Sequence, residues 1–241
     1  MQSQLLVPVS VSSVAASAAS TKFTPATRIQ ESVLSAAEKR TLLWLATRLP
    51  AWINSDHLTA LGLVALMVAG CCYAAAKANP LFLSLVTFCL VVNWFGDSLD
   101  GTLARVRNRQ RPRYGFYVDH VTDALGALFL MGGLALSGYI HPAVAIAMLV
   151  AFLLLSIEVF LATYTLGAFH LSFWGFGPTE VRVLLAIGNA VLLIHPYAHI
   201  AGHTYLLFDV GGVIASAGMF GMFLFSAVNH TAQLYREERL G

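Results

Sequence analysis

The sequence predicts an all-α, polytopic membrane protein with six transmembrane helices and an N-terminal amphipathic interfacial helix. Of its 241 residues, 58% are hydrophobic and 11% are charged, whereas soluble globular domains carry about 25% charged residues. Several uncharged stretches approach the roughly 20 residues that a helix needs to cross a bilayer. The formal net charge of +2 is small and the basic residues form no stripe, so we expect no nucleic-acid partner.

The chain is expected to begin with a mobile tail, followed by a helix on the membrane surface. Residues 1–28 mix Leu, Val, Ala and Ser and lack the basic start of a signal peptide. In residues 29–50, apolar residues are interleaved with charged ones such as Glu38, which is typical of an interfacial amphipathic helix. Pro50 ends this helix, and Asn54, Ser55 and Asp56 offer caps for the helix that then enters the membrane.

Six apolar segments follow within residues 51–235, and short breaks rich in Pro, Gly or Arg separate them. An even number of spans puts the interfacial helix and a short C-terminal tail, residues 236–241, on the same side of the membrane. The six expected spans are about 56–77, 81–105, 115–138, 141–167, 179–195 and 205–230.

Lysine and arginine residues predict the orientation, because cytoplasmic loops of membrane proteins retain positive charge. Of the 14 Lys and Arg residues, all except Lys77 fall on the side that holds both termini. We therefore expect an integral protein of a bacterial inner (cytoplasmic) membrane with both termini facing the cytoplasm.

Four aspartates lie within the expected spans, where ionisable groups are costly and often functional. Asp97 and Asp100 are one turn apart near the cytoplasmic end of the second span, and Asp119 and Asp123 are one turn apart near the start of the third. Consecutive spans are antiparallel, so both pairs reach the same depth. Converging carboxylates repel each other unless they bind protons or cations, and oxygen ligands favour Mg²⁺ or Mn²⁺. We therefore expect two bridged divalent cations, the clamp used for displacement at phosphorus.

Small and basic residues accompany these acids. Gly101 and Ala104 remove side-chain bulk from the turn after Asp100, so a ligand could approach the backbone there. Close helix packing is the alternative explanation for such residues. Arg105 could bind a diphosphate, or it could be an ordinary arginine of a cytoplasmic loop.

The arrangement of these residues resembles the signature of the CDP-alcohol phosphotransferase family. All eight signature positions are present at the expected spacing, and the resemblance covers roughly residues 30–235. The matching residues are Asp97-Ser98-Leu99-Asp100-Gly101-Thr102-Leu103-Ala104-Arg105, then after nine residues Gly115, after three more Asp119, and after three more Asp123.

The resemblance implies a reaction and assigns roles to the matching residues. A phosphoryl-linked group would pass from a CDP-alcohol, here expected to be CDP-diacylglycerol, to a hydroxyl acceptor with release of CMP. Transfer from CDP-choline or CDP-ethanolamine to diacylglycerol is the alternative within the family. By resemblance, the two metal ions would be bound by Asp97, Asp100, Asp119 and Asp123. Asp123 would also be the catalytic base. The residues that would bind CDP are Asp97, Asp100, Gly101, Thr102, Ala104, Arg105 and Gly115.

The acceptor is less well marked in the sequence. Arg111, Arg113 and Arg182 are candidates for binding a phosphate on the acceptor, although their charges could equally serve topology. Gly132-Gly133 and Gly211-Gly212 would permit the close helix contacts of a homodimer, which the family resemblance suggests.

Two functions of other classes fit some of the same residues. A cation transporter would line its path with the four acids, but it would have no use for the neighbouring Gly, Ala and Arg residues. An intramembrane prenyltransferase also binds diphosphate with aspartates, but it needs more spans and more widely separated acidic motifs. Release of CMP would distinguish the phosphotransferase from both.

Overall fold

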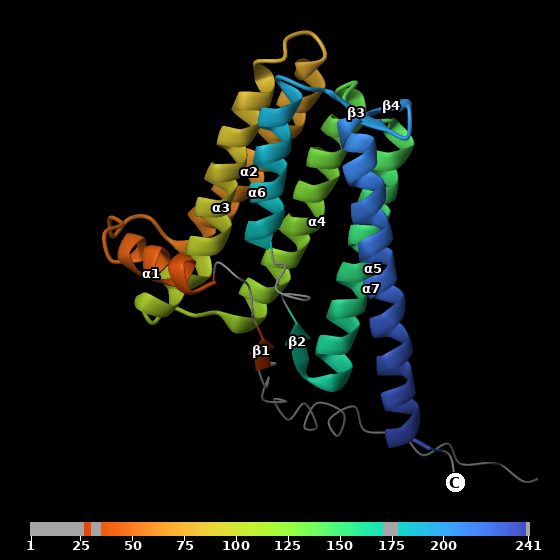
Figure 1. Ribbon diagram of the computed structural model, residues 1–241. Helices are drawn as coiled ribbons and strands as arrows, with labels where there is room; N and C mark the ends of the chain where they lie inside the picture. Colours follow the sequence, from red (N-terminus) through yellow and green to blue (C-terminus); the bar gives the residue numbers. More distant parts are fainter. Residues whose placement is uncertain (1–26, 30–34, 171–177, 240–241) are drawn as a thin grey trace, which may run out of the picture.

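The computed structural model describes residues 27–29, 35–170 and 178–239. This part of the chain forms an α-helical bundle with two short strand pairs at its ends (Figure 1). The all-α membrane fold is therefore confirmed. The helices are α1 (Ser35–Ala46), α2 (Ser55–Ala76), α3 (Phe82–Val106), α4 (Pro112–Leu136), α5 (Pro142–Leu166), α6 (Pro178–Leu192) and α7 (Leu207–Glu237).

Helix α1 lies across one end of the bundle, beside the C-terminal part of α3 (Figure 1). It buries Leu42 and Ala46 in a cluster with Leu99 and Leu103 of α3, while Trp44 is exposed. This two-sided helix lies inside the expected range 29–50, but it is shorter. Residues 30–34 and nearly all of the expected tail, residues 1–26, lie outside the described part of the chain.

Helices α2, α3 and α4 pack closely through glycines. A Cβ atom at Gly96 would collide with the backbone of Leu58 and Gly62 on α2, and one at Gly133 on α4 would overlap the carbonyl group of Gly70 on α2. Such backbone-to-backbone approaches are typical of small-residue interfaces in membranes. They place α3 and α4, which carry the four aspartates, on the same rigid partner.

Helices α5 and α7 form the other side of the bundle (Figure 1). Nδ1 of His230 on α7 lies 2.5 Å from Oε1 of the buried Glu158 on α5. Gly212, one of the glycines expected at a dimer interface, instead faces Val144 and Met148 of α5. Gly133 also faces a neighbour within the chain, so Gly133 and Gly212 serve packing inside one chain, and a homodimer is not supported by them.

Helix α6 runs beside α3 and is the shortest of the six bundle helices (Figure 1). Its Asn189 is fully buried and accepts a 2.8 Å hydrogen bond from the hydroxyl of Tyr73 on α2. The 15 residues of α6 extend over about 22 Å, less than the roughly 30 Å of a bilayer core. Among the described residues, five of the six expected spans are thus helices long and apolar enough to cross a membrane, and the segment expected at 179–195 is shorter.

The two ends of the bundle differ. We call the end where α3 stops and α4 starts the acidic end, because it holds the aspartates. There, β1 (Thr27–Ile29) pairs in parallel with β2 (Ala168–His170), and α7 continues to Glu237, into the expected tail. The opposite end is closed by the hairpin of β3 (Tyr197–Ile200) and β4 (His203–Leu206), with Ala201 and Gly202 at positive φ in its turn.

Candidate active site

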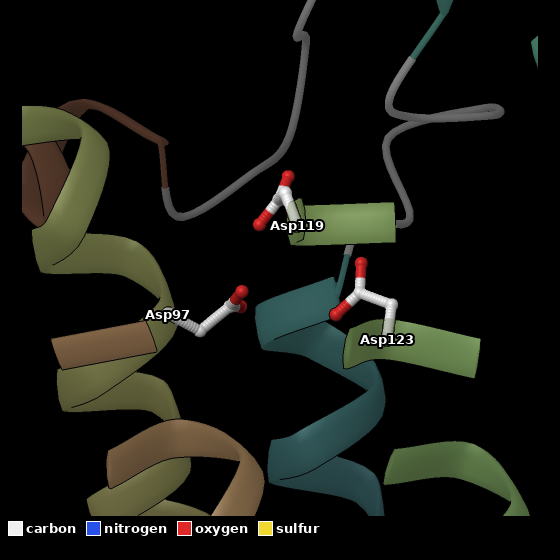
Figure 2. Close-up of side chains that lie close together, drawn as sticks. All are labelled: Asp97, Asp119 and Asp123. Atoms are coloured by element: carbon white, nitrogen blue, oxygen red, sulfur yellow. The ribbon is translucent and has the colours of Figure 1, made fainter. Parts of the chain in front are cut away.

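Three aspartates from two helices meet at the acidic end. Asp97 comes from α3, and Asp119 and Asp123 come from successive turns of α4. One carboxylate oxygen from each lies within 4.8 Å of the other two. Figure 2 shows the three side chains pointing toward a common space. The antiparallel arrangement and one-turn spacing expected from the sequence therefore bring these three acids together.

The fourth aspartate has a different neighbour. Oδ2 of Asp100 accepts a 2.5 Å hydrogen bond from the hydroxyl of Thr59 on α2, and its carbonyl oxygen accepts one from Ser55 Oγ at 2.9 Å. Asp100 is therefore one turn from Asp97 on the same helix, but its carboxylate lies apart from the three-aspartate group. Thr59 was not among the residues predicted from the sequence, since a threonine in an apolar helix gives no signal by itself.

Arg182 of α6 reaches into the same region. Its Nη2 donates to Oδ2 of Asp97 at 2.5 Å, and its Nε donates to Oδ1 of Asn93 at 2.7 Å. Nδ2 of the buried Asn93 in turn donates to the carbonyl oxygen of Gly62 on α2. The third guanidinium nitrogen, Nη1, is buried and has no hydrogen-bond partner among the residues that the structure describes. Arg182 was predicted as an acceptor-binding residue, and the structure places it beside a predicted metal ligand.

The donor set suits a hard divalent cation. Mg²⁺ binds oxygen ligands at about 2.0–2.1 Å, so two oxygens on one ion are separated by up to about 4.2 Å. The oxygens of Asp97, Asp119 and Asp123 are already close to that separation. Within the described ranges, the group contains no histidine or cysteine, the ligands that zinc would favour.

His120 follows Asp119 in sequence but belongs to an aromatic cluster. Its ring stacks on Phe116 at a centroid distance of 4.1 Å and meets the edge of Phe160 on α5 at 4.4 Å. The ring thereby helps to pack α4 against α5, next to the acids.

A cavity of about 390 Å³ lies at the same end, between the start of α2 and the end of α3. Arg111 pairs with Asp56 at its rim and lies over the ring of Tyr114 at 4.1 Å. Arg107 donates to the backbone carbonyls of Leu49 and Pro50, so it fixes the turn between α1 and α2. The lining residues are Asn54, Ser55, Asp56, Leu103, Ala104, Arg107, Arg109, Gln110 and Arg111.

Asn54, at the edge of this cavity, caps α2 as the sequence predicts. Its side chain accepts from the backbone N–H of His57 at 3.0 Å, and the His57 ring accepts from the backbone N–H of Asn54. This reciprocal capping box satisfies two N–H groups at the start of α2. It fixes where α2 begins and therefore the position of Thr59 one turn later.

Of the small residues predicted to bind CDP, one lines the cavity and the others lie outside its lining. Ala104 lines the cavity, whereas Thr102 is buried and accepts a 3.0 Å hydrogen bond from Nη2 of Arg105. A Cβ at Gly101 would lie 3.5 Å from Nη1 of Arg105, and one at Gly115 would meet open space. Of the other predicted acceptor residues, Arg111 lines the cavity and Arg113 is exposed.

Comparison with known proteins agrees with this site. No curated protein matches the chain at a significant level. The family model described as CDP-alcohol phosphatidyltransferase matches residues 52–224, which include α2 to α6 and the acidic cluster. The match decides against the cation transporter and the prenyltransferase. The chain belongs to the CDP-alcohol phosphatidyltransferase family, whose members are membrane transferases of substituted phosphate groups in phospholipid biosynthesis.

Proposed function

We propose that this protein transfers the phosphatidyl group of CDP-diacylglycerol to the hydroxyl of a polar acceptor and releases CMP, with two divalent cations, Mg²⁺ or Mn²⁺, as cofactors. The observation that supports this most is the meeting of Asp97, Asp119 and Asp123 within 4.8 Å, inside the matched domain. Carboxylates gathered near apolar helices are stabilised by metal, and a diphosphate is a natural further ligand of such ions.

The metal ligands in this proposal are the three clustered aspartates and Asp100. When bound, the cations supply positive charge that neutralises the diphosphate and the departing phosphate of CMP. Asp100, whose carboxylate accepts a hydrogen bond from Thr59, lies one turn from Asp97 on α3 and is assigned to the second ion. Arg105, on the turn after Gly101, supplies a fork of donors for the diphosphate.

Asp123 is the catalytic base in this proposal. Its carboxylate lies within 4.8 Å of those of Asp97 and Asp119, so an acceptor hydroxyl held at the cluster would lie next to it. The acceptor oxygen forms a bond to the β-phosphorus, which carries the diacylglycerol; the bond from that phosphorus to the oxygen of CMP breaks; and the hydroxyl proton passes to Asp123. Atoms and charges balance without a further reactant.

Binding of a phosphorylated acceptor is assigned to Arg111, Arg113 and Arg182. Arg182 supports this best, because Nη2 pairs with Asp97 and Nε with Asn93, while the buried Nη1 has no hydrogen-bond partner in the described part of the chain. A further anion near Nη1 would satisfy that donor. The cavity next to Ala104 and Arg111 supports binding of the CDP moiety.

We further propose that the acidic end faces the cytoplasm of a bacterial cell. The arginines between α3 and α4 and those at the end of α7 lie at this end, whereas Lys77 follows α2 at the other. Soluble acceptors and the departing CMP would then exchange directly with the cytoplasm.

The test is an assay of CMP release by the purified protein in nanodiscs with Mg²⁺. CDP-diacylglycerol would be offered with glycerol phosphate, inositol phosphate, serine, choline or ethanolamine, and CDP-choline and CDP-ethanolamine would be offered with diacylglycerol. We expect CMP with CDP-diacylglycerol and one polar acceptor, its loss in EDTA, and its return with Mg²⁺ or Mn²⁺. CMP only from CDP-choline or CDP-ethanolamine would reverse the donor assignment, and CMP release unaffected by EDTA would refute the metal requirement.

A further inference from the structure

One side chain of the surface helix α1 contacts both helices that form the Arg182–Asp97 pair. Oε1 of Glu38 accepts hydrogen bonds from Nε1 of Trp94 at 2.8 Å and from Oγ of Ser98 at 3.2 Å, both on α3. The same oxygen accepts from Oγ1 of Thr179 on α6 at 2.8 Å. Glu38 thus joins three helices through a single carboxylate oxygen.

These donors sit next to residues of the site. On α3, Trp94 is one turn before Asp97, and Ser98 directly follows it. On α6, Thr179 is one turn before Arg182. The hydrogen bonds to Glu38 therefore hold α6 against α3 at the level where Arg182 contacts Asp97.

Besides the contacts of Arg182 with Asn93 and Asp97, a further contact between α3 and α6 lies deeper in the bundle. Nδ2 of Asn189 on α6 donates a 3.4 Å hydrogen bond to Oγ1 of Thr87 on α3, about two turns beyond Arg182. The N-terminal turn of α6 starts at Pro178, which has no backbone N–H to contribute. The hydrogen bond from Thr179 to Glu38 thus helps to hold the first turn of α6 beside α3 at the site.

We propose that Glu38 is a positioning residue that sets the contact of Arg182 with Asp97, and so tunes the cation affinity of the aspartate cluster. This inference rests on the proposed function, since it assigns a divalent cation to that cluster. The guanidinium of Arg182 competes with a metal cation for the carboxylate of Asp97, and its positive charge repels that cation. Loss of the Glu38 hydrogen bonds frees the first turn of α6 and weakens that competition.

The experiment measures Mn²⁺ binding to purified protein by electron paramagnetic resonance, which needs no catalysis. We expect Arg182→Ala to tighten Mn²⁺ binding about tenfold, because it removes a positive charge from a ligand carboxylate. Glu38→Ala should tighten binding in the same direction and add little in an Arg182→Ala background. An unchanged affinity in Glu38→Ala, or fully additive effects of the two substitutions, would overturn the inference.

Two conservative variants separate positioning from a general loss of stability. Glu38→Gln retains an oxygen that accepts from the same donors, so its Mn²⁺ affinity should stay within about twofold of the wild type. Thr179→Val removes one donor with little change in shape and should shift the affinity partway toward that of Glu38→Ala. Glu237 is an exposed acid at the same end of the bundle, so Glu237→Ala is the matched control and should leave the Mn²⁺ affinity unchanged. A Glu38→Gln variant that behaves like Glu38→Ala contradicts a role through hydrogen bonds.

A second readout does not depend on metal. Spin labels at the exposed positions Val91 on α3 and Val183 on α6 report the spacing of the two helices. Glu38→Ala should broaden the distribution of that spacing, whereas Glu38→Gln should not. Wild-type protein that binds no Mn²⁺ would refute the metal site of the proposed function, while the spacing would still decide whether Glu38 positions α6.

Discussion

Asp97 has two kinds of neighbour, and they act on it in opposite ways. Arg182 neutralises its charge through a 2.5 Å contact, whereas the carboxylates of Asp119 and Asp123 repel it from within 4.8 Å. A cation that joined the three acids would relieve the repulsion and compete with the arginine. Cation affinity at this site therefore reflects the balance of both contacts.

The substitution Asp123→Asn is expected to separate cation binding from catalysis. The amide retains an oxygen for a cation but cannot take a proton from the acceptor hydroxyl, so CMP release should fall by about 10²- to 10⁴-fold. Asp97 and Asp119 remain, so we expect Mn²⁺ binding to persist.

The matched control is Asp209→Asn at the opposite end of the bundle. Its side chain accepts from the backbone N–H of His141, which an asparagine oxygen can also do, so activity should be retained. Near-normal CMP release by Asp123→Asn would show that another group is the base.

The residues of the cluster could be predicted from sequence because one-turn spacing on two consecutive helices leaves little freedom. The partners of those residues could not. Contact of Thr59 with Asp100, and of Arg182 with Asp97, depends on how α2 and α6 are rotated about their axes, which no local pattern fixes. Glu38 was predicted only as a charge on an amphipathic helix, since its three donors are separated from it by more than 50 residues in the chain.

Among the helices, the contact of α2 with α4 depends on the absence of side chains. A methyl group at Gly133 would overlap the carbonyl group of Gly70, so these helices would have to separate. Hydrophobic periodicity predicts that both are spans, but it does not show which glycine faces which helix.

The variants Gly133→Ala and Gly132→Ala, at neighbouring positions of α4, test this packing when their stabilities are compared. The first should lower the free energy of unfolding by about 1–3 kcal/mol, because the added methyl group overpacks the contact. The second, with nothing within 4 Å of its Cβ, should be neutral or raise it by up to about 1 kcal/mol, since alanine favours a helix. Denaturation of the purified proteins in detergent measures both, and equal stabilities would contradict the packing described for α2 and α4.

Element lengths were the least predictable feature of the fold. The apolar segment near 179–195 reads as a span, yet helix α6 ends at Leu192, before the His195-Pro196 break and the β3–β4 hairpin. Its position in the bundle comes from buried polar contacts such as Tyr73 with Asn189, which a hydropathy pattern does not include.

The whole molecule is asymmetric along the bundle axis. The four aspartates of α3 and α4, the loop arginines and the end of α7 are at one end, whereas the hairpin and Lys77 are at the other. This distribution makes the orientation in the membrane a testable property.

We expect Glu238→Cys to react with a membrane-impermeant maleimide only from the cytoplasmic side and Lys77→Cys only from the opposite side. Both positions are exposed, and both changes would be made in a protein whose Cys71, Cys72 and Cys89 have been replaced. Labelling of intact cells reports the outer side of the membrane, and labelling of inverted vesicles reports the cytoplasmic side. Labelling of both positions from one side would refute the proposed topology.

Direct main-chain contact at Gly70–Gly133 and at Gly62–Gly96 also affects how the sequence can diverge. Side chains that face lipid can be exchanged freely, since only their hydrophobicity matters there. A methyl group added at a glycine where these backbones clash with it would instead shift α3 or α4 and thereby move their aspartates relative to one another. Comparison of close relatives should therefore find substitutions concentrated on the outer surface, with Gly70, Gly96 and Gly133 kept as glycine.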